Sequence, residues 1–128
     1  MRCVARIEGA RAATLDVLAH DIDRQDILTL NLTRAVQLCV DVATHVLTEK
    51  ALSAPSTMGE SFDELLNMGV IDEATRDRLR AAVGFRNIAV HSYRKISWEV
   101  VHRISYAAPD ELRAFARQVL EFDQPPKP

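Results

Sequence analysis

The chain has 128 residues, 48% of them hydrophobic and 5% aromatic, with a formal net charge of −2. A chain of this length forms one core that buries roughly two-thirds of the unfolded surface, so we expect a single domain over residues 1–128. The low net charge excludes a general polycation that coats nucleic acid, and the scarcity of aromatic residues favours packed helices over a β-sandwich.

The two cysteines and four histidines do not form a pattern typical of a metal site or a disulfide framework. No cationic start precedes an apolar segment, and no apolar run approaches the ~20 residues that cross a bilayer. We therefore expect no metal, no membrane segment and a cytoplasmic protein.

The first half of the chain predicts two helices. Residues 1 to about 20 carry apolar side chains at helical spacing, and Asp21 and Asp23 offer capping carboxylates for a longer helix from about Arg24 to Lys50. This second helix is apolar over so much of its circumference that more than one neighbour must cover it. In so small a domain another protomer can supply that cover, so we predict a dimer.

Polar side chains on the long helix follow a three-and-four spacing that places them on one face. This stripe is either a solvent-exposed surface or the border of a cleft, where its polar groups would hold other site residues. In the second interpretation Asp41 is the natural carboxylate partner for an arginine or a histidine. The stripe consists of Asn31, Arg34, Asp41, His45 and Thr48.

The clearest internal break lies between Ser53 and Glu60, where proline, serine and glycine gather. Ser61, followed by Glu64, matches a capping box and predicts the start of a short helix. Gly69 then stands where a left-handed residue ends a helix.

The second half of the chain continues as helices. Asp72 is predicted to begin a helix that runs through Phe85, and the final helix is predicted to begin after Pro109. The proline-rich residues 124–128 are expected to form a flexible tail. The pattern as a whole indicates an all-α fold of about five helices.

The segment RNIAVHSY, residues 86–93, carries the clearest chemistry. An arginine grips phosphate with parallel hydrogen bonds, and a histidine both takes and gives a proton near neutral pH. Cleaving RNA without a metal needs a base for the attacking 2′-hydroxyl and a cation for the phosphate oxygens. Arg86 and His91 therefore predict a phosphodiester-cleaving site. The alternative is a chance motif, with Arg86 a surface charge and His91 a solvated imidazole.

The flanking residues and the spacing qualify this interpretation. Asn87 either binds the substrate backbone or caps a helix end. If residues 85–93 are helical, Arg86 and Tyr93 lie on nearly the same face, whereas His91 points to the side. One copy then surrounds a phosphate poorly, and a two-fold dimer would bring a second arginine and histidine to the opposite wall.

Residues 72–95 also carry a local surplus of positive charge, with six basic side chains against three acidic ones. Such a surplus can attract RNA even when the rest of the surface is acidic. For Arg76, Arg78 and Arg80 individually we favour the alternative of a solvated helix face with mixed charges.

The Arg-x-x-x-x-His-x-Tyr signature, preceded by Gly84-Phe85, resembles that of the HepT toxins. These are HEPN-domain ribonucleases paired with a minimal nucleotidyltransferase antitoxin. The resemblance extends to the long second helix and to the segment that leads into the motif. It implies an all-α, HEPN-like bundle whose homodimer brings two motifs face to face across a cleft. It also implies metal-independent RNA cleavage by the toxin of a type VII-like toxin–antitoxin system.

The resemblance further assigns catalysis to Arg86 and His91 and makes Tyr93 the acceptor of AMP transferred by the antitoxin. The partner consumes the ATP, so the chain itself would need no cofactor. A competing hypothesis is a catalytically silent helical dimer that only binds a nucleotidyltransferase or a nucleotide. Supporting roles would fall to four polar residues: Asn31, Arg34, Asp41 and Asn87.

Overall fold

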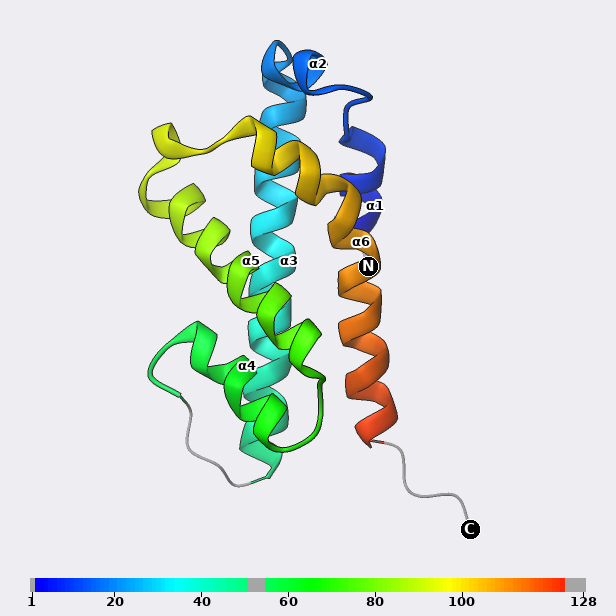
Figure 1. Ribbon diagram of the computed structural model, residues 1–128, viewed down its shortest axis with the longest axis vertical. Coiled ribbons are helices and arrows are strands. Elements are labelled where there is room, and N and C mark those ends of the chain that lie inside the picture. Colours follow the sequence, from blue (N-terminus) through cyan, green and yellow to red (C-terminus); the bar gives the residue numbers. More distant parts are fainter. Residues whose placement is uncertain (1, 51–54, 124–128) are drawn as a thin grey trace.

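The computed structural model describes residues 2–50 and 55–123, and every regular element in these two ranges is a helix. The long helix α3 runs through the molecule, with α1 and α6 along one side and α4 and α5 along the other (Figure 1). The predicted all-α fold is thereby confirmed. The elements are α1 (Arg2–Ala10), α2 (Leu15–Ala19), α3 (Ile22–Glu49), α4 (Met58–Asn67), α5 (Glu73–His91), the 3₁₀ turn η1 (Tyr93–Lys95) and α6 (Trp98–Asp123).

The hydrophobic core surrounds α3 and draws side chains from every α-helix. Phe62 of α4 is fully buried and meets Phe115 of α6 edge to face, with 6.1 Å between the ring centroids. One face of α3 stays uncovered in the single chain: Leu30, Leu38 and Val42 are 49%, 45% and 39% exposed. The other helices of one chain therefore do not cover the whole apolar circumference of α3.

Three helix boundaries follow the predicted local chemistry. The Asp21 carboxylate accepts a hydrogen bond from the backbone N–H of Arg24 at 3.1 Å, and that of Asp72 accepts one from Thr75 at 2.8 Å. Both carboxylates satisfy a donor that the first helical turn would otherwise leave unpaired. Gly69 adopts a φ of 77°, the left-handed conformation expected beyond the end of α4.

The single N-terminal helix predicted over residues 1–20 is in fact two helices. α1 ends at Ala10 and α2 begins at Leu15. The break arises because Thr14 is extended and its hydroxyl accepts the Val17 N–H at 3.2 Å, which starts a new helix at that point.

The predicted cap of the short fourth helix is also wrong. Thr57 is the N-cap, accepting the Glu60 N–H at 3.3 Å, and the Glu60 carboxylate reaches back to the backbone N–H of Ser56. Ser61 lies inside α4 and is buried. The capping chemistry is of the expected kind but lies four residues earlier, because the apolar face of α4 begins at Met58. Residues 51–54 of the predicted break lie outside the described residues.

The last helix begins at Trp98 rather than after Pro109, which sits buried in the middle of α6. A proline inside a helix removes one backbone hydrogen bond and costs about 3 kcal/mol. α6 nevertheless continues, because Val101 before the proline and Leu112 and Phe115 after it are buried in the same core. Residues 124–128, the predicted tail, lie outside the described residues.

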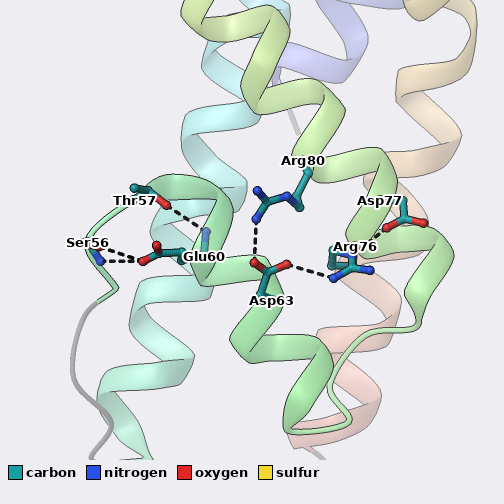
Figure 2. A network of polar contacts seen from close by, with 7 residues as sticks. All are labelled: Ser56, Thr57, Glu60, Asp63, Arg76, Asp77 and Arg80. Carbon is teal, nitrogen blue, oxygen red and sulfur yellow. Dashed lines mark hydrogen bonds and ion pairs between the residues drawn. The ribbon is translucent and has the colours of Figure 1, made fainter.

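A polar network fixes α5 against α4, as Figure 2 shows. The two carboxylate oxygens of Asp63 on α4 accept hydrogen bonds from Arg76 at 3.0 Å and from Arg80 at 2.6 Å on α5. Arg76 also binds its neighbour Asp77 at 2.7 Å. The network anchors the first half of α5, so the position of its far end, which carries the RNIAVHSY segment, is set by the fold.

Within residues 2–50 and 55–123, none of the helices combines the length and hydrophobicity needed to cross a membrane.

Candidate active site

The RNIAVHSY residues occupy the end of α5 and the turn that follows it. Arg86 lies in the last two turns of α5, and His91 is its final residue. The N–H of Ser92 donates to the carbonyl of Ile88 at 2.8 Å, and the chain then enters η1 at Tyr93. The condition under which Tyr93 would share the face of Arg86, a continuous helix over residues 85–93, is therefore not met. Because the helix ends at Ser92, the phenol is directed toward another element of the fold.

The Arg86 side chain is half-buried and incompletely bonded. Its Nη1 donates to the Asn87 amide oxygen at 3.3 Å, whereas its Nε is buried and has no hydrogen-bond partner among the described residues. A buried donor without a partner destabilises a fold by about 1–3 kcal/mol. Asn87 lies within α5, so it contacts the guanidinium instead of capping a helix end. Nη2 is not among the buried unpartnered atoms and forms no hydrogen bond with the described residues, so it is the donor left to bind an anion.

The His91 imidazole is exposed at the C-terminal end of α5. Neither ring nitrogen forms a hydrogen bond or an ion pair within the described part of the chain, so both are accessible to a substrate. Arg86 and His91 do not bond to each other in one copy.

Tyr93 is held by two contacts with elements outside α5. Its hydroxyl donates to the Asp26 carboxylate at 3.2 Å, and its ring meets the Trp98 indole edge to face at 6.3 Å. Burial, followed by the hydrogen bond and the negative charge of Asp26, raises the pKa of Tyr93. The signature tyrosine is thereby tied to the first turns of α3, while its side chain remains 48% exposed.

The supporting residues predicted on α3 do not contact Arg86 or His91 within one chain. The Asp41 carboxylate instead accepts a hydrogen bond from Gln37, one turn earlier, at 3.0 Å. Asn31 is buried, and its amide donates to the Ile27 carbonyl at 2.8 Å. Arg34 is exposed on the surface. The predicted direct pairing of Asp41 with the motif is therefore not formed in the single copy, because the Asp41 side chain lies along α3 itself.

The positive surplus over residues 72–95 is smaller than the sequence indicates. Arg76 and Arg80 share the Asp63 carboxylate on a partly exposed surface, which agrees with the favoured interpretation of a helix face with mixed charges. Arg78 lies 3.9 Å from Glu111. Arg94 and Lys95, both exposed in η1, are the cations that remain beside the motif.

An apolar groove of about 530 Å³ opens between α3, α5 and α6 next to the motif helix. Phe85 and Ile88 of α5 line one wall, and Val100 and Ile104 of α6 line the other. Among residues 2–50 and 55–123, no three histidine, cysteine or acidic side chains are grouped in a way that could hold a metal ion.

The family model described as Ribonuclease HepT-like matches residues 2–119. This chain belongs to the HepT-like ribonuclease family. The HepT-like chain is 33% identical over 110 residues to the mRNA nuclease HepT of Shewanella oneidensis, spanning 85% of this chain and 82% of that protein.

Solved structures of toxin–antitoxin complexes share the same fold. One is a tri-AMPylated Shewanella oneidensis HEPN toxin in complex with MNT antitoxin, with a TM-score of 0.86, 28% identity, and coverage of 94% of this chain and 90% of that one. Another is a toxin–antitoxin with AMP-PNP, with a TM-score of 0.84, 28% identity, and coverage of 92% and 89%. The predicted HEPN-like architecture of the HepT-like chain is confirmed by these matches.

Sequence reasoning missed one residue of this site. Asp26 contacts the Tyr93 hydroxyl although the two residues are 67 positions apart. In the sequence Asp26 is one of several acidic residues near the start of a helix, and nothing in its surroundings sets it apart. Trp98 is half-buried and packs against Tyr93.

Proposed function

We propose that this HepT-like chain is the toxin of a type VII-like toxin–antitoxin system, acting in the cytoplasm as a single domain over residues 1–128. Its activity is metal-independent endoribonuclease cleavage that uses Arg86 and His91. The observation that carries the proposal is the placement of both residues at the end of α5, where the Arg86 guanidinium bonds only to Asn87 among the described residues and the His91 ring is exposed. The similarity to an mRNA nuclease supports RNA as the substrate.

The chemistry follows from these two side chains. His91 takes the proton of the 2′-hydroxyl, the 2′-oxygen bonds to phosphorus, and the bond from phosphorus to the 5′-oxygen breaks. Arg86 stabilises the charge that grows on the non-bridging oxygens, where preorganised donors have their greatest effect. The leaving 5′-oxygen takes a proton from a second acid. In a two-fold dimer, His91 of the other copy is available for that step.

Homodimerisation is part of the proposal. Leu30, Leu38 and Val42 leave an apolar strip on α3, and the groove between α3, α5 and α6 adds further apolar surface beside the motif. Covering such surface by a second copy is favourable at roughly 25 cal/mol per Å² buried. In such a dimer we assign supporting roles at the motif of the other copy to Arg34 and Asp41, because both are exposed on α3.

Control by AMP transfer completes the proposal. A nucleotidyltransferase partner transfers AMP from ATP onto Tyr93, so the toxin itself needs no cofactor. The solved relative that is tri-AMPylated and bound to MNT antitoxin supports this form of control. A nucleotide on Tyr93 adds bulk and negative charge within a few residues of Arg86 and His91, where it competes with RNA for the same cation.

Cleavage of RNA by purified variants tests the proposed activity. Arg86→Ala and His91→Ala should each lower cleavage by about 10²–10⁴, the usual effect of losing a positioned acid–base or charge-stabilising group. His20→Ala is the matched control, because the exposed His20 ring contacts only Asp16 on α2 among the described residues, and this variant should retain full activity. Cleavage should persist in excess EDTA and leave a cyclic phosphate or a 3′-phosphate.

The competing hypothesis is a silent dimer that binds a nucleotidyltransferase or a nucleotide without cutting RNA. It predicts that the wild-type protein and the His91→Ala variant have the same effect on growth and on bulk RNA. Light scattering at micromolar concentration tests the dimer separately. A monomer with full nuclease activity would contradict the composite cleft, and a strict requirement for added magnesium would contradict the metal-independent mechanism.

A further inference from the structure

We propose that Asp26 is the general base for AMP transfer onto Tyr93, so that the toxin supplies a catalytic group for its own modification. This inference rests on the proposed function, because it concerns the site at which the partner nucleotidyltransferase acts. It assigns the Asp26 carboxylate to the acceptor side of the reaction, where it orients the phenol and removes its proton.

The first observation is the contact itself. The Tyr93 hydroxyl donates to Asp26 Oδ1 at 3.2 Å, within the reach that proton transfer to a base needs. Among the described residues, Asp26 is the charged group that acts on this hydroxyl, through both its hydrogen bond and its charge. Asp26 forms no ion pair with any described cation, so its lone pairs are not shared with a competing positive group.

The second observation is that the phenol is held in place yet open. The edge contact with Trp98 and the hydrogen bond to Asp26 restrict the Tyr93 side chain, while nearly half of the residue remains exposed to an approaching enzyme. A nucleophile fixed at one angle and accessible from outside is suited to an in-line attack on phosphorus. The short turn η1, which carries Tyr93, begins beyond the end of α5, so the backbone of that helix does not cover the hydroxyl.

The chemistry requires such a base. Tyrosine hydroxyls are almost fully protonated at neutral pH, and the pKa of this one is raised further, by burial first and then by Asp26. A carboxylate that accepts the hydroxyl proton of a substrate is the arrangement that protein kinases use in phosphoryl transfer. Here the carboxylate belongs to the acceptor protein, 67 residues away from the tyrosine in sequence.

The step balances as follows. Tyr93 Oη attacks the α-phosphorus of ATP held by the partner, and a bond forms between Oη and phosphorus. The bond from the α-phosphorus to the oxygen bridging to the β-phosphorus breaks, and pyrophosphate leaves with that electron pair. The phenolic proton passes to the Asp26 carboxylate and from there to solvent.

The test compares initial rates of AMP incorporation, followed by intact mass, with ATP, magnesium and the cognate nucleotidyltransferase. Asp26→Asn keeps the size of the side chain and an oxygen acceptor but removes the basic carboxylate. We expect kcat to fall by about 10²-fold or more while KM for the toxin is unchanged. Asp23→Asn is the matched control, because it removes the same charge one turn earlier on α3, where the carboxylate is exposed.

The pH profile separates a base from a merely positioning carboxylate. Without a base, the rate depends on the fraction of Tyr93 that is already ionised, which rises about tenfold per pH unit below the tyrosine pKa. The ratio of the wild-type rate to the Asp26→Asn rate should therefore shrink as pH rises from 6 to 9. Taking this ratio also cancels any titration of the partner enzyme itself.

The outcomes distinguish the two proposals. Equal rates for the wild type and Asp26→Asn, or a deficit that is constant across pH or resides in KM, would overturn the role of Asp26 while leaving Tyr93 as the acceptor. Failure of the wild type to gain AMP, or equal labelling of Tyr93→Phe, would overturn the acceptor assignment in the proposed function. Selective loss of kcat with a shrinking rate ratio would establish Asp26 as the base.

Discussion

Replacing Arg86 by methionine should abolish RNA cleavage without destabilising the protein. Methionine keeps an unbranched stem of similar length, so most of the packing of the half-buried side chain is retained. The substitution removes the buried Nε that lacks a partner, which relieves a cost of about 1–3 kcal/mol. It also removes the 3.3 Å hydrogen bond to Asn87, an exposed contact worth at most about 1 kcal/mol.

The balance is a free energy of unfolding that is unchanged or raised by up to about 2 kcal/mol. For a domain of this size such a gain raises Tm by roughly 3–4 °C per kcal/mol. RNA cleavage should nevertheless fall by about 10²–10³, the effect of removing one preorganised donor from a developing oxyanion. An active site that carries an unsatisfied group in this way exchanges stability for function.

The measurements are thermal and urea unfolding, alongside cleavage of bulk RNA. Arg6→Met on α1 is the control, because Arg6 is exposed and its loss should change stability by no more than about 0.5 kcal/mol. A fall in Tm for Arg86→Met well beyond that of the control would refute the reasoning. It would mean that Nε is hydrogen-bonded in solution, for instance by the second copy of a dimer.

Three further predictions follow from individual side chains. The folded state raises the pKa of Tyr93, by burial first and then by Asp26. The protonated phenol therefore contributes stability below about pH 10, and this contribution is lost as pH rises through the pKa of the folded state. Absorbance titration of the wild type minus Tyr93→Phe should show this raised pKa, and Asp26→Asn should lower it. Burial raises the pKa of Cys39 to about 12, so the thiol should resist alkylation by iodoacetamide at pH 8 until denaturant is added. Rapid alkylation of Cys39 in the native protein would contradict this prediction. Asp63→Ala should lower the free energy of unfolding by about 1 kcal/mol in urea, a modest effect because solvent screens the half-exposed Arg80. A change below about 0.3 kcal/mol would show that the network does not stabilise α5.

The sequence predicts those parts of the fold that depend on neighbouring residues. Asp21, Asp72 and Gly69 act at helix ends through groups only a few positions away, and all three were identified from sequence. Thr57 and Ser61 show the limit of this reasoning, because both can cap a helix. Tertiary packing, which buries Ser61, decides between them.

Pro109 shows how burial overrides a local rule. A proline predicts the start or the end of a helix, yet α6 passes through it because apolar side chains on both sides share one core. The same limit applies to the site. The motif positions Arg86 and His91 are read directly from the sequence, whereas the contact of Tyr93 with Asp26 joins distant segments and depends on where α5 ends.

The end of α5 at Ser92 also changes how modification of Tyr93 would act. If the phenol lay on the face of Arg86, a nucleotide would simply cover that face. In the structure the hydroxyl instead donates to Asp26, and a phosphodiester on the same oxygen leaves no hydrogen to donate. The bond to Asp26 is then lost, and the new negative charge lies beside a carboxylate that repels it. A modified tyrosine side chain that turns away from Asp26 can pair with the exposed cations of η1, Arg94 and Lys95, which an RNA phosphate would also use.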